Sequence, residues 1–165
     1  MGKTIICLAL LAALACAPAA AGSKFADGLG DATGPLVGLG IAATFFGSGD
    51  NAKNDAVKVG DAAVVSVGLA ELLKPNLKVE NNGYNHSFPS GHTAIAFGTA
   101  TALAELHPKQ KWLYYAGAAL LGWSRVESDA HTWKDVLGGA ALGIGAGRLS
   151  MTSDGGLMFA RIVRF

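Results

Sequence analysis

The stretch HSFPSGHTAIAFGTATALAEL, residues 86–106, joins a cluster of polar and turn-forming residues directly to an apolar segment of helix length. The Pro-Ser-Gly sequence marks a turn, and Ser90 has a side chain suited to capping a helix that starts near His92. Two histidines, two serines, a proline and a glycine stand within seven residues. The stretch predicts an apolar helix with its polar chemistry gathered at the amino-terminal end.

Further apolar segments of helix length lie on both sides of this stretch. Turn sequences such as GSGDN and HPKQK separate them. The segments are residues 34–47, 57–73, 112–124 and 135–149. We therefore expect an all-α, membrane-embedded bundle of five to six apolar helices in one domain, the number depending on whether residues 1–21 contribute a helix.

Residues 1–21 contain the apolar run TIICLALLAALACAPAAAG, which follows Lys3 and ends in small residues. This pattern is typical of a secretory signal peptide, here with a cleavage site near Ala19–Ala21. Retention as a first transmembrane helix is an alternative. Lipid attachment at Cys16 is a third interpretation, although the preceding residues make a poor lipidation site. All three interpretations direct the chain out of the cytoplasm.

The composition favours membrane helices that pack closely. Of the 165 residues, 51% are apolar and only 15% are charged, whereas about 25% is usual for charged residues. The 23 glycines lie mostly in apolar runs, as in bundles whose helices approach closely. A soluble helical protein rich in Ala and Gly is the alternative, since most segments are shorter than a membrane span. The net charge of +1 gives no reason to expect nucleic acid as a partner.

The charged residues in the connections between apolar segments can be compared with a membrane topology. In this topology the first apolar run enters from the cytoplasm, and later segments cross the membrane in alternating directions. Lys53, the HPKQK turn and the arginines of the tail then fall on the cytoplasmic side, as the positive-inside tendency requires. The unusual polar clusters all fall on the other side. We therefore expect a bacterial inner-membrane protein with these clusters facing the periplasm, or a periplasmic protein associated with that membrane.

Three polar clusters need one explanation: LLKPNLKVENN, FPSGHT and SRVESDAHTWKD. The third cluster places His131 and Asp135 four residues apart at a helix start, where their side chains can meet. A carboxylate bound to one imidazole nitrogen fixes the tautomer and leaves the other nitrogen as a nucleophile. Arg125 lies six residues before His131 and offers a planar fork for phosphate oxygens. This cluster favours phosphoryl chemistry.

The other two clusters supply charge and a proton donor. Ser90 and Gly91 place a hydroxyl and backbone N–H groups at a helix amino terminus, which attracts anions. His92 follows on the first turn and can donate a proton to a leaving oxygen. Lys74, at the end of the segment 57–73, adds a positive charge. The three clusters together predict an oxyanion pocket suited to phosphoryl transfer.

Each cluster alone has a commoner structural explanation. A lysine at a helix end is usually a solvated cation, Pro-Ser-Gly-His is usually a turn with a cap, and a His/Asp pair is usually structural. Metal binding is a further alternative for the histidines. Their spacing does not match a metal site, and both cysteines lie in residues 1–21. We expect no metal and no cofactor.

The order of Lys74, then PSGH, then S-R-x5-H-x3-D resembles the phosphatidic acid phosphatase type 2 superfamily, which also includes bacterial nonspecific acid phosphatases and vanadium haloperoxidases. The resemblance covers residues 57–147. It implies a helical domain, here residues 22–150, that hydrolyses phosphate without a metal. In that family's mechanism His131 would attack phosphorus, Asp135 would orient it and His92 would protonate the leaving group. The phosphate would be held by Lys74, Ser90, Gly91 and Arg125.

The first motif departs from the family pattern of Lys, six residues, then Arg-Pro. Here Asn81 and Asn82 stand where Arg-Pro is expected. Asn81 can donate a hydrogen bond to phosphate but supplies no charge, and Lys78 is a candidate to compensate. The change leaves open a slower enzyme or one with an altered substrate.

The resemblance and the apolar composition imply a phosphatase that acts on lipid phosphate or polyprenyl diphosphate through a phosphohistidine. One alternative is a catalytically impaired family member that binds anionic lipid phosphates. Another is a vanadate-dependent haloperoxidase, whose known members are much longer. The tail, residues 151–165, is expected to be a packing element with no assigned role, and the alternation of apolar and polar residues near its end is compatible with a short strand.

Overall fold

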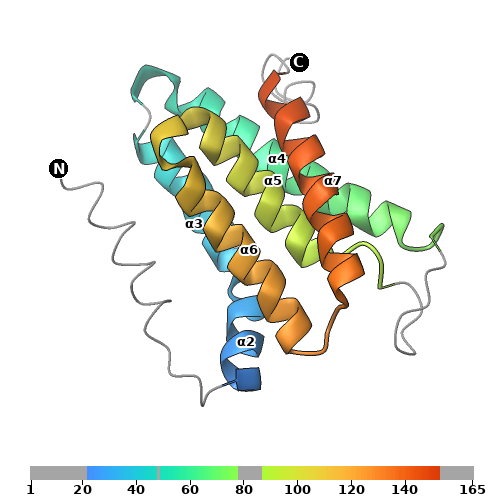
Figure 1. Ribbon diagram of the computed structural model, residues 1–165. Helices are drawn as coiled ribbons and strands as arrows, with labels where there is room; N and C mark the ends of the chain where they lie inside the picture. The colour runs from blue at the N-terminus through green and yellow to red at the C-terminus, as the bar shows by residue number, and fades with distance from the viewer. Residues whose placement is uncertain (1–21, 48, 78–86, 153–165) are drawn as a thin grey trace.

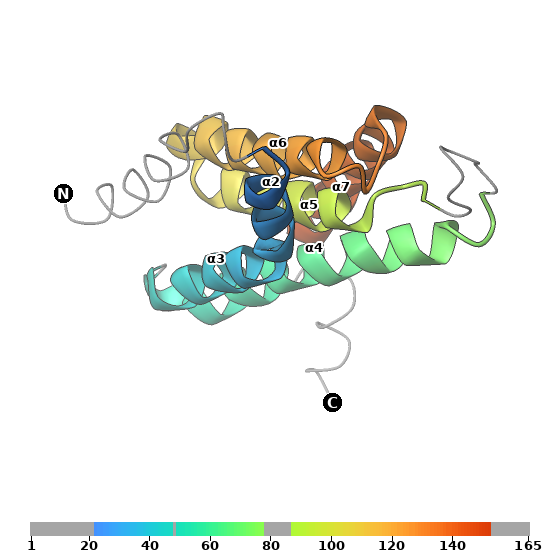
Figure 2. The ribbon, with the colours of Figure 1, turned by 90° about the horizontal axis from the view of Figure 1, so that it is seen from below.

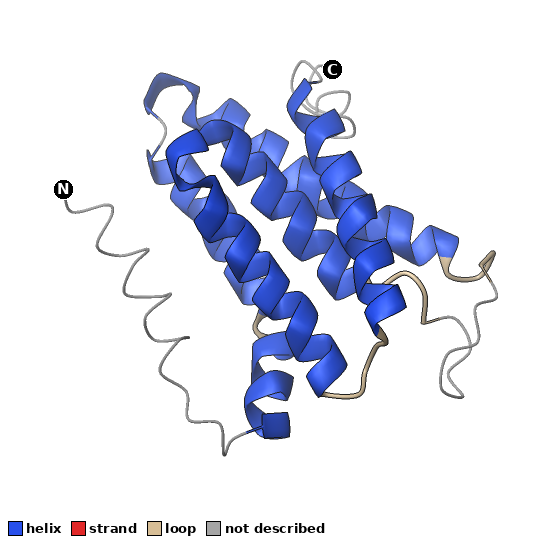
Figure 3. Ribbon diagram, viewed as in Figure 1, coloured by secondary structure: helices blue, strands red, loops and turns tan. Residues whose placement is uncertain are grey.

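The computed structural model describes residues 22–47, 49–77 and 87–152, and within them every regular element is a helix (Figure 3). The all-α prediction is confirmed, and each of the five predicted segments lies inside an observed helix. The α-helices are α2 (Gly22–Asp31), α3 (Thr33–Gly47), α4 (Ala52–Leu73), α5 (Gly91–Leu106), α6 (Lys111–Glu127) and α7 (Trp133–Thr152). Short 3-10 turns, Gly49–Asn51 and Pro108–Gln110, precede α4 and α6.

Two predictions concern the ends of the chain. The signal sequence predicted for residues 1–21 lies outside the described residues. Helix α7 continues to Thr152, so it includes the first two residues of the predicted tail. The short strand with which the end of the tail is compatible, within residues 153–165, also lies outside the described residues.

Helix α5 is the central element and packs against α4, α6 and α7 (Figure 1). Ser90 is its N-cap, as predicted, because its backbone is extended and its Oγ accepts a hydrogen bond from the N–H of Thr93. The helix buries small side chains around its circumference, among them Ala94, Ala100 and Ala102. Small residues on all sides let three neighbouring helices approach α5 closely.

Helices α5 and α7 make the closest approach, along the glycine row Gly139, Gly143 and Gly147 of α7. A β-carbon on Gly143 would overlap the carbonyl oxygen of Ala94, and one on Gly147 would lie 2.7 Å from the carbonyl oxygen of Gly98. The four-residue spacing keeps these glycines on one face of α7. The two backbones are therefore in contact, with no space for a side chain between them.

Buried polar contacts fix α4 against α7 far from the amino terminus of α5. Ser150 Oγ donates to Asp61 Oδ2 at 2.9 Å, and both residues are fully buried. Lys58 Nζ donates to the carbonyl oxygen of Met151 at 3.4 Å. A hydrogen-bonded polar pair inside an apolar bundle favours one register, because any shift would leave buried polar groups unpaired.

Helix α2 was not predicted from the sequence. Its sequence, GSKFADGLGD, has few apolar residues, but Phe25 and Leu29 lie on one face and pack into a core with Ala96, Ala118 and Leu121. Figure 2 shows α2 between α3 and α6, lying across one end of the bundle. Burial against α5 and α6 stabilises a segment whose intrinsic helix propensity is low.

A helix that spans a membrane must be long and apolar. Within residues 22–47, 49–77 and 87–152, none of the helices is by itself both long enough and apolar enough to cross a bilayer. Residues 24–31 and 33–47 meet the requirement only as a pair, with a bend of 43° between them. The membrane embedding expected from composition remains a prediction.

The glycine row makes a stability prediction. Gly143→Ala should destabilise the fold by about 1–3 kcal/mol, because the obstructing atoms are backbone and cannot move aside cheaply. Gly145→Ala is the matched control on the same helix, since a β-carbon there meets nothing within 4 Å. It should be neutral or stabilising by up to about 1 kcal/mol. Denaturant unfolding measures both, and equal unfolding midpoints would contradict the close α5–α7 contact.

Candidate active site

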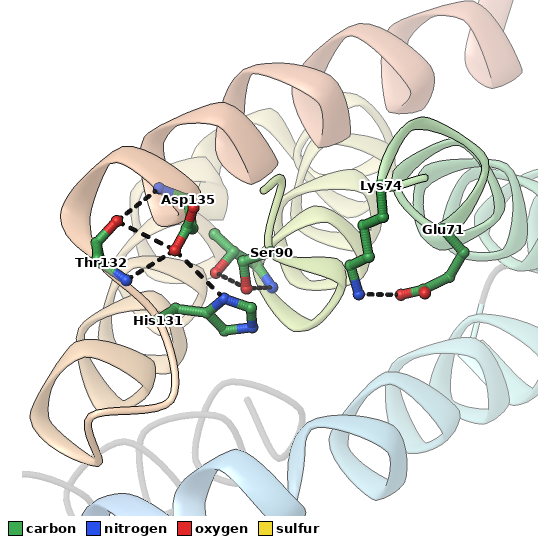
Figure 4. Close-up of polar contacts among 7 residues, drawn as sticks. Glu71, Lys74, Ser90, His131, Thr132 and Asp135 are labelled. Carbon is green, nitrogen blue, oxygen red and sulfur yellow. Dashed lines mark hydrogen bonds and ion pairs between the residues drawn. The ribbon is translucent and has the colours of Figure 1, made fainter. Parts of the chain in front are cut away.

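The predicted site residues come from the ends of four helices. Lys74 directly follows α4, Arg125 lies in the last turn of α6, and His131 precedes α7. Figure 4 shows His131 and Asp135 on one side of Ser90 and Lys74 on the other. The structure places seven of the eight predicted site residues at this end of the bundle, and Asn81 lies outside the described residues. The seven are Lys74, Ser90, Gly91, His92, Arg125, His131 and Asp135.

A backbone hydrogen bond aligns the starts of α5 and α7. The N–H of Ser90 donates to the carbonyl oxygen of Asp135 at 3.0 Å. Both residues are fully buried. The two sequence motifs, 45 residues apart from Ser90 to Asp135, are thereby joined at the residues expected to hold the phosphate and orient the nucleophile.

Asp135 is held by a capping box. Its Oδ2 accepts hydrogen bonds from the backbone N–H of Thr132 at 2.9 Å and from Thr132 Oγ1 at 3.1 Å. In return the N–H of Asp135 donates to Thr132 Oγ1 at 3.5 Å. Sequence reasoning missed Thr132, although the pattern T-x-x-D at a helix start could have indicated it. The carboxylate therefore has a fixed position before it interacts with any imidazole.

His131 faces this carboxylate. Its Nδ1 lies 3.6 Å from Asp135 Oδ2, which is within ion-pair distance but longer than a hydrogen bond. The imidazole is largely buried, with 12% of its side-chain surface exposed. Because Nδ1 faces Asp135, Nε2 is the ring nitrogen left to meet a substrate. The two side chains meet, as their spacing predicted, but the expected hydrogen bond between them is not formed in this structure.

The loop from Arg125 to His131 is closed by its own backbone. The N–H of His131 donates to the carbonyl oxygen of Arg125 at 2.9 Å. Asp129 adopts a left-handed conformation with φ of 54° to make the turn, which Asp tolerates better than most residues. The bond fixes the backbone of Arg125 relative to the imidazole. Arg125 Nε is buried and has no hydrogen-bond partner among the described residues.

Lys74 lies over the amino terminus of α5. Its Nζ is 3.7 Å from the position that a β-carbon on Gly91 would occupy. Its ammonium pairs with Glu71 Oε1 at 2.6 Å, as Figure 4 shows. Glu71 was not predicted, and its carboxylate lies 2.7 Å from the same position at Gly91. In this structure the Glu71 carboxylate is the negative charge beside the helix terminus and the ammonium, so an anionic ligand would compete with it there.

The hydroxyl of Ser90, unlike the charged groups of Lys74 and Arg125, takes part in the hydrogen bonding of its own helix end. Its Oγ is fully buried and accepts hydrogen bonds from the N–H and hydroxyl of Thr93. Ser124, in the third motif, is also fully buried and donates to the carbonyl oxygen of Leu121. In this arrangement both hydroxyls organise helix ends. The first N–H groups of α5, at Gly91 and His92, have no carbonyl partner within their own helix.

Burial lowers the pKa of His131 below its ordinary value of 6.5. The Asp135 carboxylate opposes this by favouring the charged ring, while the positive charges of Arg125 and Lys74 add to the lowering. The imidazole is therefore neutral at neutral pH and keeps a free lone pair. A neutral ring is what a nucleophilic histidine requires.

The pKa of His92 is lowered as well. Part of its ring remains exposed, but burial of the rest is the largest cause, followed by the charges of Arg125 and Lys74. The carboxylates of Asp31 and Glu71 oppose the lowering. A bound phosphate would bring negative charge to this ring and raise its pKa. His92 is thus suited to take up a proton together with an anionic ligand.

Among the residues that the structure describes, no group of three or more His, Cys, Asp or Glu side chains could hold a metal ion. His107 lies at the carboxyl end of α5, where its ring is 6.3 Å from that of Tyr114. His86, for which no role was predicted, lies outside the described residues.

The His131–Asp135 pair makes a pKa prediction. Asp135→Asn should lower the pKa of His131 further, because Asp135 is the charge that raises it. The matched control is Asp129→Asn, which removes a charge from the same loop and suits the left-handed backbone there. NMR titration of the imidazole protons measures both variants. An unchanged pKa in Asp135→Asn would contradict the pairing.

The lowered pKa values of His92 and His131 also predict how the free energy of unfolding changes with pH. Both histidines titrate below 6.5 in the folded protein, so the unfolded chain takes up protons first as the pH falls through 6.5. Unfolding free energy should therefore decrease as the pH falls from about 6.5 toward the folded-state pKa values. The histidine contribution should be constant above that range.

Two known proteins are similar to the chain in sequence. The chain is 44% identical over 68 residues to lipid A 1-phosphatase of Porphyromonas gingivalis. The aligned region covers 39% of this chain and 15% of that protein. It is 37% identical over 76 residues to bacitracin transport permease protein BcrC of Bacillus licheniformis, covering 46% of this chain and 37% of that protein. The chain thus spans well under half the length of either relative.

No solved structure matches the chain significantly. The family model of the PAP2 superfamily matches residues 52–157, which include α4 to α7 and all the predicted site residues. The match covers more than half of the chain and agrees with the motifs from which the family was first expected. The chain belongs to the PAP2 superfamily.

Proposed function

We propose that the protein is a metal-independent phosphatase that works through a phosphohistidine on His131. The observation that carries the proposal is the gathering of an imidazole–carboxylate pair and an ammonium near the amino terminus of α5, with the Arg125 guanidinium close enough to act on both imidazoles. Phosphoryl transfer depends mostly on positioning and on stabilising charge. This end of the bundle offers both.

In the proposed reaction Nε2 of His131 attacks phosphorus, and the bond from phosphorus to the leaving oxygen breaks. His92, protonated in the presence of the substrate charge, gives its proton to that oxygen. Water then attacks the phosphohistidine, the P–N bond breaks and His92 takes up the proton released by the water. Orthophosphate leaves, and both imidazoles return to their starting state.

The phosphate oxygens would be held by groups with distinct roles. Arg125 supplies a charged fork. Lys74 supplies a point charge beside the N–H groups at Gly91. Because Ser90 Oγ already caps α5, we assign Ser90 the role of presenting these backbone donors. Asp135 keeps Nδ1 of His131 protonated and directs Nε2 outward.

We propose lipid phosphates or polyprenyl diphosphates as the substrate class. Apolar residues close in sequence to the site residues have exposed side chains, namely Leu72 at 70%, Trp133 at 55% and Leu137 at 65%. They can receive a hydrocarbon chain while the phosphate binds among the charges. The name of the P. gingivalis relative refers to a lipid phosphate. We place the protein at the bacterial inner membrane, with the site facing the periplasm.

A binding protein without turnover is the second candidate, and the observation that favours it is Asn81. The family pattern has an arginine at this position, and its loss removes one positive charge from the first motif. The remaining cations, Lys74 and Arg125, would still bind a phosphate. Turnover assays distinguish this candidate from the enzyme.

The phosphatase proposal predicts phosphate release by detergent-purified protein from phosphatidic acid, polyprenyl diphosphate or a small aryl phosphate. Release should persist with EDTA and fall by at least about 10³-fold in His131→Ala, because the nucleophile is gone. His107→Ala is the matched control, since His107 lies at the opposite end of α5. Loss of activity with EDTA, or full activity in His131→Ala, would contradict the mechanism.

The departure at Asn81 predicts a gain of function. Asn81→Arg should raise kcat/KM by up to about 10²–10³-fold, because a charged bidentate contact to the transition state is restored. Asn82→Arg adds the same charge one residue away and should have a much smaller effect. Equal gains in both variants would indicate general electrostatic attraction of the substrate, and no gain in either would mean that the loop does not reach the phosphate.

A further inference from the structure

We propose that α2 forms a wall of the active site and that Gly30 is a positioning residue, because its bare Cα makes room for the guanidinium of Arg125. The proposal rests on the phosphatase function proposed above. It adds an element that lies outside the family match at residues 52–157.

The contact is direct. A β-carbon built on Gly30 would overlap Nη1 of Arg125 and would lie 3.1 Å from Cζ and 3.4 Å from Cδ. The end of the arginine side chain therefore rests on the backbone of α2, in space that every other residue type would fill. Gly30 itself is buried. The guanidinium has one face against α2, and this restricts the directions in which its donors can point.

Two further observations place the end of α2 at the site. Leu29, next to Gly30, is buried in the core with Ala96 and Leu121, so α2 is anchored to α5 and α6. The carboxylate of Asp31, the last residue of α2, is close enough to His92 to oppose the lowering of its pKa. The carboxyl end of a helix also carries partial negative charge, which favours a cation such as Arg125.

The consequence of adding a β-carbon can be derived from what it meets. At Gly143 the obstructing atoms are backbone, whereas at Gly30 they are the end of a flexible side chain. The protein can accept a methyl group at Gly30 by moving the guanidinium and leaving the helices in place. A displacement of about 1 Å at a catalytic group can reduce the rate by about 10²-fold.

The test compares Gly30→Ala with Gly28→Ala. Both changes introduce the same side chain on α2, but a β-carbon on Gly28 meets nothing within 4 Å. Gly30→Ala should lower kcat/KM on the best substrate by about 10- to 100-fold, with little change in melting temperature. Gly28→Ala should keep wild-type activity. Equal activity of the two variants would overturn the proposal.

A double-mutant cycle separates positioning from a general structural effect. In an Arg125→Ala background, Gly30→Ala should cause no further loss, because the side chain it displaces is absent. A loss as large as in the wild-type background would overturn the proposal. If Gly30→Ala alone fails to fold, recovery of folding in the double variant would support the contact, and continued misfolding would refute it.

A readout on Arg125 itself does not depend on turnover. The chain has four arginines, so 15N-labelled arginine gives few Nε–H signals to assign. The buried Nε–H of Arg125 should exchange slowly in the wild type and in Gly28→Ala and faster in Gly30→Ala. If the wild type releases no phosphate, the phosphatase function fails while this exchange still decides the role of Gly30. Unchanged exchange in Gly30→Ala would overturn the proposal in either case.

Discussion

The site depends on the contact between α5 and α7, where the backbone N–H of Ser90 meets the carbonyl oxygen of Asp135. The glycine row of α7 makes this bond possible, since side chains there would push the helices apart. The amino termini of α5 and α7 then lie together, at the end of the bundle where α4 and α6 finish. An anion placed there meets aligned peptide dipoles as well as charged side chains. The small residues that let these helices pack closely therefore also position the groups for which we propose anion binding.

Much of the fold could be predicted because apolar segments and turn residues alternate clearly along the chain. Helix α2 could not, because its apolar surface is small and its stability comes from packing against α6. The motifs indicated Lys74, the residues around His92 and the third cluster, since each carries recognisable chemistry. Their roles in catalysis, like that of Asn81, remain predictions.

The supporting residues differ in how visible they are in the sequence. Thr132 belongs to a capping pattern that local reading could have found. Glu71 lies three residues before Lys74, a spacing at which helical side chains meet, so local reading could have found it as well. Gly30 follows no such pattern, because its place beside Arg125 arises from a contact between α2 and α6, which are distant in sequence. A glycine in particular gives no chemical signal, and only the neighbour that occupies its missing side-chain space reveals its role.

The capping box at Asp135 has a consequence for reading related sequences. The carboxylate accepts two hydrogen bonds that start α7, so the fold needs it whether or not the protein turns over a substrate. A descendant that had lost catalysis would still be under pressure to retain it. Its presence is therefore weak evidence of activity in any homologue. His131, whose Nδ1 makes no hydrogen bond within the described part of the chain, is the more informative position for telling a working enzyme from an inactive relative.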